Sequence, residues 1–209
     1  MIGVILGIAG VGTLIIKRWD APLPMNIGGY ICVLAASVAE GITVMLLTKG
    51  EPWHSRFFLS VIGGALLLAS VTDLLLCQVY NFIWWPALCA ALVLLGQRWR
   101  LCRLYGLRED LFREGLCFLL FFVILQLTVF GRMYGRADSY AFCVCGAAGV
   151  ARGMDGWGMV MHMLLAYGLL LPVQALGRNI DKRGNLKRKV PFVPYIVAAF
   201  WAALLWGKR

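Results

Sequence analysis

The chain has 209 residues, 61% of them hydrophobic, and carries 20 Lys and Arg against 10 Asp and Glu, a formal net charge of +10. A soluble domain is about half apolar, and the mean hydropathy here is +0.80. These values exclude the water-soluble fold classes and predict a polytopic membrane protein. Most charges lie between apolar runs, so basic loops that fix topology explain the net charge better than nucleic-acid binding, and we expect no nucleic-acid partner.

Eight apolar segments follow one another along the chain. A membrane-crossing helix needs about 20 apolar residues, and fewer where flanking side chains snorkel to the interface. The pattern therefore predicts an all-α polytopic membrane helix bundle of about eight segments, forming a single integral-membrane domain over residues 1–209. The sixth segment is short and rich in glycine. The segments are 2–16, 27–48, 57–76, 82–96, 115–131, 139–152, 157–176 and 190–206.

The longest polar connections are Gln97–Glu114 and Gly177–Lys189. The second carries six basic residues against a single acid, Asp181, and the positive-inside rule assigns it to the cytoplasm. Counting back from there puts the end of the third segment and the stretch Gly135–Asp138 on the same face, with both termini outside. By the same parity Gln97–Glu114 is external, although it holds five arginines, and it is either an amphipathic interfacial helix or a solvated loop.

Two aspartates stand in or beside the apolar segments. Asp73 lies in the third segment, and Asp138 comes just before the sixth. Ionisable groups at membrane depth are costly and are functional candidates by default. Taken singly, Asp73 could neighbour a helix end and Asp138 could pair with Arg132 or Arg136. Together, on one face of the membrane, they predict the shared carboxylate site of an aspartyl protease.

The seven cysteines lie mostly in apolar segments, and no two of them form a C-x-x-C pair. A structural zinc site needs about four ligands. The cysteines are therefore interpreted as small buried hydrophobic residues. We expect neither a metal nor an organic cofactor.

Several short stretches, in order along nearly the whole chain, resemble motifs of the bacterial type IV prepilin peptidases, which are GxGD-type intramembrane aspartyl proteases. In this family an E-x-x-T motif lies in the second helix, and a G-x-G-D motif holds the second catalytic aspartate. The matching stretches are Gly7–Pro22, Glu40-Gly41-Ile42-Thr43, Asp73 with Val79-Tyr80-Asn81, Gly135-Arg136-Ala137-Asp138 and Val190-Pro191-Phe192-Val193-Pro194-Tyr195.

The chain departs from the family pattern at identifiable positions. Ala137 stands where the family has the second glycine, and Tyr80 stands where it has a proline. Ser139-Tyr140-Ala141 occupies the place of a lysine that usually follows the second aspartate. The link Lys17–Asn26 is too short for the Cys-rich cytoplasmic insert of many members, so we expect peptidase chemistry without methyltransferase activity.

The resemblance implies an aspartic endopeptidase in the cell inner membrane that cleaves the basic leader of prepilins or pilin-like proteins near the cytoplasmic face. Asp73 and Asp138 would be the catalytic dyad. One carboxylate would activate water while the other, protonated, polarises the scissile carbonyl. The implied partners are a pilin-like membrane substrate and the lipid bilayer. The residues expected to bind substrate or support the site are Gly135, Ala137, Glu40 and Asn81.

Two other functions remain open at this point. One is a catalytically silent relative that binds pilin-like helices, suggested by Ala137 and the missing lysine. The other is a small proton-coupled transporter that uses Asp73, which would predict internal repeats, and no convincing repeat is found in the sequence. Glu40 also has a simpler interpretation, a polar contact between two helices.

Overall fold

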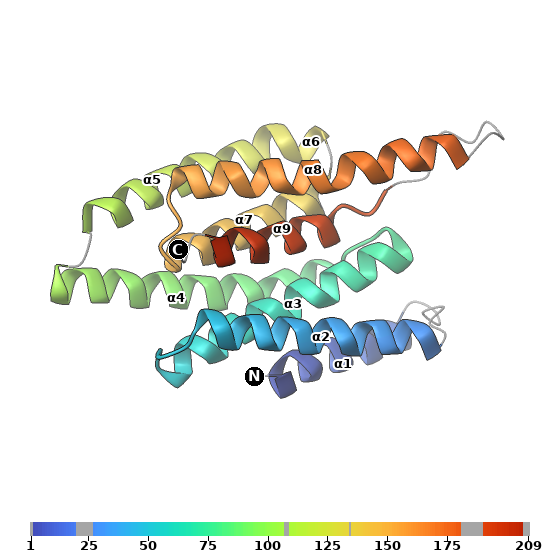
Figure 1. Ribbon diagram of the computed structural model, residues 1–209, viewed down its shortest axis with the longest axis horizontal. Helices are drawn as coiled ribbons and strands as arrows, with labels where there is room; N and C mark the ends of the chain where they lie inside the picture. Colours follow the sequence, from blue (N-terminus) through green and yellow to red (C-terminus); the bar gives the residue numbers. More distant parts are fainter. Residues whose placement is uncertain (1, 20–26, 107–108, 134, 181–189, 207–209) are drawn as a thin grey trace.

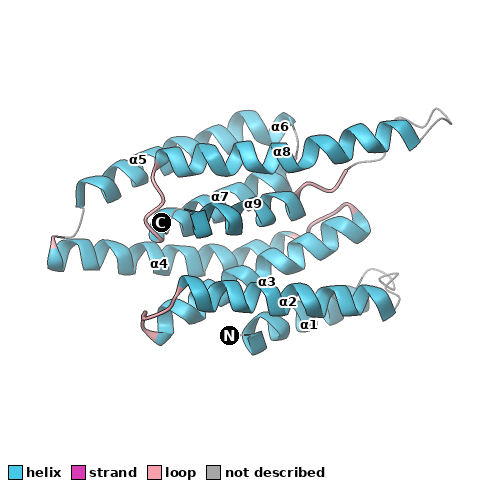
Figure 2. Cartoon of the chain, in the orientation of Figure 1, coloured by secondary structure: helices cyan, strands magenta, loops and turns pink. Residues whose placement is uncertain are grey.

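A computed structural model describes residues 2–19, 27–106, 109–133, 135–180 and 190–206. Within these ranges the chain is almost entirely helical, with short connections and no strand (Figure 2). The predicted all-α helix bundle is thereby confirmed. The elements in order are α1 (Ile2–Trp19), α2 (Ile27–Leu47), α3 (Trp53–Leu76), η1 (Asn81–Ile83), α4 (Trp84–Tyr105), α5 (Glu109–Leu125), η2 (Gln126–Phe130), α6 (Gly131–Met133), α7 (Arg136–Ala151), α8 (Gly156–Ile180) and α9 (Val193–Trp206).

The long helices lie side by side and alternate in direction (Figure 1). In that view α1 and α2 form one side of the bundle, α5 and α8 form the other, and α3, α4, α7 and α9 lie between them. As a result, the C-terminal end of α3 and the N-terminal ends of α7 and α9 meet at the same end of the bundle. This is the arrangement that span counting predicts for the two aspartates.

Helix α3 is the central element. Almost every side chain from Leu59 to Asp73 is buried, which suits a helix that is apolar on all its faces. Helix α1 approaches it closely at Gly64, where an added Cβ would lie 3.3 Å from the Cα of Ile5 and 3.1 Å from the Cβ of Ile8. A small residue at this contact lets the two backbones pack at short range.

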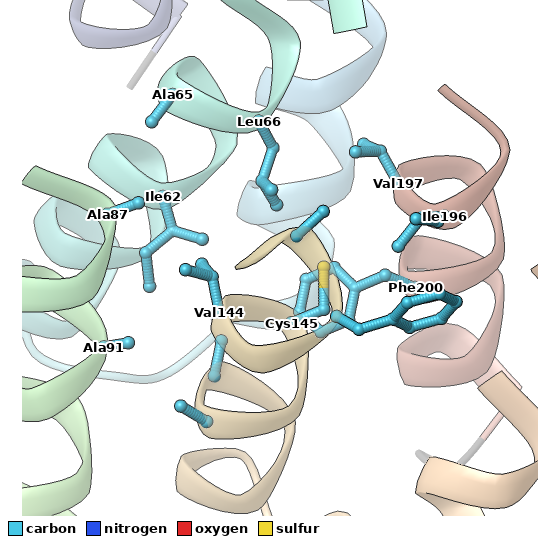
Figure 3. Close-up of a cluster of buried hydrophobic side chains, with 14 of the residues drawn as sticks. Ile62, Ala65, Leu66, Ala87, Ala91, Val144, Cys145, Ile196, Val197 and Phe200 are labelled. Atoms are coloured by element: carbon cyan, nitrogen blue, oxygen red, sulfur yellow. The ribbon is translucent and has the colours of Figure 1, made fainter. Parts of the chain in front are cut away.

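Helix α7 is built largely from Ala, Gly and Cys, and most of its residues are buried. Its small side chains let neighbouring helices pack closely around it, as is usual between membrane helices. Figure 3 shows the result, where α7 meets α3, α4 and α9 in one apolar cluster. The residues labelled there are Ile62, Ala65, Leu66, Ala87, Ala91, Val144, Cys145, Ile196, Val197 and Phe200.

Large apolar side chains cover much of the outer surface, as lipid-facing helices require. Among them are Met45 and Leu46 of α2, Leu120 and Phe121 of α5, and Leu171 of α8. An exposed apolar surface of this extent is uncommon on a soluble monomer. Four described helical stretches are long and apolar enough to cross a membrane: Trp53–Leu76, Asn81–Tyr105, Glu109–Met133 and Gly156–Ala175. Ile31–Leu47 and Val193–Trp206 are shorter apolar helices.

Of the two alternatives for Gln97–Glu114, the solvated loop is wrong, because most of its described residues are helical. Helix α4 continues to Tyr105, where Gly106 ends it in the left-handed conformation with φ 60°, and α5 begins at Glu109. Two acidic residues in the first turn of α5 suit the positive end of a helix. Arg98, Arg100 and Arg103 therefore lie on α4 and Arg113 lies on α5, two helices that also bury apolar residues such as Cys102 and Phe112. In the other long connection, α8 continues to Ile180, and residues 181–189 lie outside the described part of the chain.

Candidate active site

Asp73 lies in the last turn of α3, just before the helix ends. Its carbonyl oxygen accepts a hydrogen bond from the N–H of Cys77 at 2.8 Å, and Cys77 adopts the left-handed conformation that closes the helix. The carboxylate is buried, and its Oδ2 accepts a hydrogen bond from the backbone N–H of Val193 at 3.0 Å. Val193 is the first residue of α9, and a first-turn N–H has no acceptor inside its own helix. Asp73 therefore joins the end of α3 to the start of α9.

Asp138 lies in the first turn of α7, three residues after a glycine with unusual geometry. Gly135 precedes the helix with φ 134° and ψ 153°, a region that residues with a side chain rarely adopt. A Cβ added at Gly135 would lie 3.2 Å from the Oδ2 of Asp138. The glycine thus serves both the backbone conformation and the space that the carboxylate occupies.

A π-helical turn lies beside Asp138. Residues Gln126–Phe130 form this turn between α5 and α6, and the carbonyl oxygen of Gln126 accepts the hydroxyl of Ser139 at 2.9 Å. Single π-helical turns inside α-helices occur frequently at functional sites. The carbonyl of Gln126 also accepts the backbone N–H of Gly131, so one oxygen joins the π-helical turn to the residue that follows Asp138 at the start of α7.

Both aspartates line one pocket of about 310 Å³ at this end of the bundle. Its size falls within the range of small-ligand sites, and it holds far more than one water molecule. The two carboxyl groups are close enough to interact electrostatically. The pocket is lined by the end of α3 and the turn after it, by the start of α7, and by the segment that leads into α9: Asp73, Cys77, Gln78, Val79, Gly135, Arg136, Ala137, Asp138, Val190 and Phe192.

Ala137 lines this pocket and needs no special backbone geometry. It lies inside the regular helix α7, and its φ is not positive. In the described part of the chain, the residue other than glycine with a positive φ is Cys77, at 50°. The unusual conformation of the G-x-A-D stretch belongs to Gly135. A second glycine is therefore not needed for this backbone path.

Glu40 lies away from the pocket, in the interior between α2, α3 and α9. Its Oε1 accepts the indole N–H of Trp201 at 2.9 Å, and its Oε2 lies 3.5 Å from the position that a Cβ on Gly63 would take. Gly63 precedes Asp73 by ten residues on α3, which corresponds to roughly 15 Å along a helix. The expected support of the site by Glu40 is therefore not a direct contact, and the geometry is that of an interhelical polar contact.

Asn81 is exposed at the start of η1 and does not line the pocket. Its backbone carbonyl accepts the N–H of Trp84, so it contributes to the turn that joins α3 to α4. Among the predicted site residues, the pocket thus brings together Asp73, Asp138, Gly135 and Ala137.

Sequence reasoning missed the backbone N–H of Val193 as a partner of Asp73. It also missed Gln78 and Ser139. A signal for the first was present, because Pro194 suits the first turn of a helix and marks the preceding N–H groups as free donors. Nothing in the sequence indicated that this helix start would meet the end of α3.

In the described part of the chain, no group of three or more His, Cys, Asp or Glu residues is arranged to hold a metal ion. The fold and the site together define an α-helical membrane protein with a two-carboxylate pocket at one end of its bundle. Comparison with protein-family models, with curated proteins and with solved structures gives no match for this chain.

Proposed function

We propose that the chain is a membrane aspartyl endopeptidase of the prepilin-peptidase type, which removes the basic leader of a pilin-like protein. The observation that carries this proposal is the pocket that Asp73 and Asp138 share, although they come from two helices far apart in the sequence. An aspartyl protease requires two interacting carboxyl groups and space beside them for a water molecule and the substrate peptide. The order of the resembling motifs supports the same activity.

The chemistry follows from the carboxylate pair. Two carboxyl groups that share a site cannot both be ionised cheaply, so together they hold one proton at neutral pH. The ionised member removes a proton from water as the water attacks the scissile carbonyl, and the protonated member donates to the carbonyl oxygen. The protonation states of the two carboxyl groups are linked, so their titration belongs to the pair and not to either residue alone.

The substrate proposal follows from the position of the pocket at the end of a helix bundle. A pilin-like substrate has a short basic leader before a hydrophobic helix, and the resemblance implies cleavage at this junction, typically after a glycine. The apolar outer faces of the bundle allow the substrate helix to remain in the membrane. The acidic pair would attract the basic leader.

We assign the pocket to the cytoplasmic face of the inner membrane, because the connection that follows α8 carries an excess of basic residues in the sequence. Helix α9 then runs from the cytoplasmic face to the outer face. Alkaline phosphatase fused after Trp206 should therefore be active, since this enzyme functions only outside the cytoplasm. An inactive phosphatase fusion would reverse the assignment.

The direct test is cleavage of a purified pilin-like substrate by the purified protein in liposomes, followed by mass spectrometry of the released leader. Asp73→Ala and Asp138→Ala should each abolish cleavage. Asp155→Asn is the matched control, because Asp155 is exposed at the start of α8, at the opposite end of the bundle, where its Oδ1 accepts the N–H of Gly158 at 2.7 Å. Asparagine caps helices about as well as aspartate, so this variant should cleave normally.

The outcomes separate the alternatives. Normal cleavage by either alanine variant would exclude the dyad. A wild-type protein that binds the substrate in a pull-down assay and never cleaves it would identify a silent, pilin-binding relative.

A further inference from the structure

We infer that the start of α9 makes Asp73 the ionised base of the pair and thereby leaves the shared proton on Asp138. This inference rests on the proposed function and adds the division of labour between the two aspartates.

The two carboxylates differ in the backbone donors that surround them. Asp73 accepts the N–H of Val193 at 3.0 Å, and this N–H belongs to the first residue of a helix of 14 residues. The N-terminus of a helix carries a partial positive charge, and its free N–H groups bind anions. A hydrogen bond to an ionised carboxylate is about twice as strong as a neutral one. The contact therefore favours the charged form of Asp73 over its protonated form.

Asp138 differs in this respect. It also lies at a helix start, but no N–H group of the described residues donates to its carboxylate. Its Oδ2 faces the α-carbon of Gly135, and the N–H of Ser139 donates to the carbonyl oxygen of Gly135 instead. When one proton is shared between the two groups, it resides on the carboxyl group whose charge is less well compensated.

Helix α9 is also held in register by two contacts further along its length, at Ile196 and Trp201. The ring Nε2 of His162 lies 2.9 Å from the carbonyl oxygen of Ile196 and must donate to it, since a carbonyl can only accept. The indole N–H of Trp201 donates to Glu40 at 2.9 Å. These contacts tie α9 to α8 and α2. They fix the position of α9 along its axis, and with it the position of the Val193 N–H.

The assignment gives a balanced reaction. Asp73 takes a proton from water as the water oxygen bonds to the carbonyl carbon, and Asp138 gives its proton to the carbonyl oxygen, which forms a geminal diol. When the C–N bond breaks, Asp73 returns its proton to the leaving nitrogen. One hydroxyl proton of the diol passes back to Asp138 as the new carboxyl group forms, and the pair regains its starting state.

The kinetic test removes the donor and keeps the helix. Val193→Pro deletes the N–H at a position where proline is well tolerated, and Phe192 before it is outside the helix. Loss of one charge-assisted hydrogen bond should move the acid limb of the kcat/KM profile to higher pH by about one unit. The alkaline limb should stay in place. Val193→Ala is the control, since it trims the same side chain, retains the N–H and should leave the midpoint of the acid limb unchanged.

The charged or titratable side chains that line the pocket beside Asp73 are Cys77, Arg136 and Asp138, within the described residues. All of them are identical in the two Val193 variants. A shift of the alkaline limb in Val193→Pro, with a fixed acid limb, would make Asp138 the base and overturn the inference.

A second measurement needs neither activity nor a stable proline variant. The wild-type protein is labelled with ¹³C at the aspartate carboxyl groups, and the signals of the two pocket aspartates are identified by their loss in Asp73→Asn and Asp138→Asn. During a pH titration the Asp73 signal should ionise before the Asp138 signal. The reverse order would overturn the inference even if the peptidase activity is established. Absence of cleavage with the expected order would instead count against the proposed function alone.

Discussion

The protein contains two buried carboxylate regions that share one feature and differ in another. At the end of the bundle Asp73 accepts an N–H at 3.0 Å, and in the interior Glu40 accepts an N–H at 2.9 Å. Asp73 opens onto a pocket of about 310 Å³ that also holds Asp138. Glu40 is packed against Gly63 and Trp201, and its second oxygen has no hydrogen-bond partner among the described residues.

The difference teaches that burial and a hydrogen bond do not by themselves make a carboxylate reactive. Hydrolysis needs a second proton-exchanging group and space for water. The pocket has both, because it lies where three helix ends meet and side chains leave a gap. In the interior, helix faces pack against one another and bury Glu40.

The largest expected effect is a loss of cleavage on substitution in the pocket, compared with substitution of Glu40 in the interior. Asp138→Asn should lower the rate of leader release by about 10²–10⁴-fold, the usual contribution of a positioned proton donor. Glu40→Gln keeps an acceptor for the Trp201 indole and should change the rate only a few-fold. Both rates are measured by mass spectrometry of the leader peptide in liposomes. A loss in Glu40→Gln as large as that in Asp138→Asn would remove the distinction between the regions.

The next effect tests the backbone beside Asp138. Gly135→Ala introduces a Cβ at φ 134° and 3.2 Å from Asp138 Oδ2, which should cost about 1–3 kcal/mol in strain. We expect at least about tenfold slower cleavage, since this strain displaces the carboxylate. Ala137→Gly is the paired control. It creates a G-x-G-D sequence at a helical position and should change cleavage only a few-fold, as measured in the same assay.

The third effect concerns stability in the interior region. Glu40→Ala leaves the buried indole N–H of Trp201 without its acceptor and should lower the free energy of unfolding by about 2 kcal/mol. Glu40→Gln should lose less, because its amide oxygen can still accept. Thermal unfolding in detergent micelles measures both. In the double variant with Trp201→Phe the two losses should not add, and simple additivity would show that the hydrogen bond contributes nothing.

The smallest effect is a gain at the rim of the pocket. Cys77 adopts φ 50°, a left-handed conformation that costs a residue with a side chain about 1 kcal/mol. Cys77→Gly should therefore raise the free energy of unfolding by up to about 1 kcal/mol, measured by the same thermal unfolding. A loss of stability would mean that packing of the thiol outweighs the backbone strain.

Part of the fold and of the site could be predicted from the order of the residues alone. Apolar segments of near-membrane length determine the helices, because a backbone in lipid must satisfy its hydrogen bonds within each segment. Their number sets the alternation of direction, and this puts Asp73 and Asp138 at the same end. The boundaries of α4 and α5 were missed because arginines on a helix that projects beyond its apolar stretch look like a polar loop.

The sequence by itself therefore determined the helices, the end of the bundle at which the two aspartates lie, and the glycine that Asp138 requires. Only the tertiary structure decided that the first N–H of α9 meets Asp73, that the carbonyl of Gln126 holds Ser139, and that Glu40 is sealed against Trp201. Two of these contacts join residues 120 and 161 positions apart in the chain, and the third joins residues 13 positions apart. They depend on the lateral position and axial register of packed helices, and local sequence patterns do not encode either one.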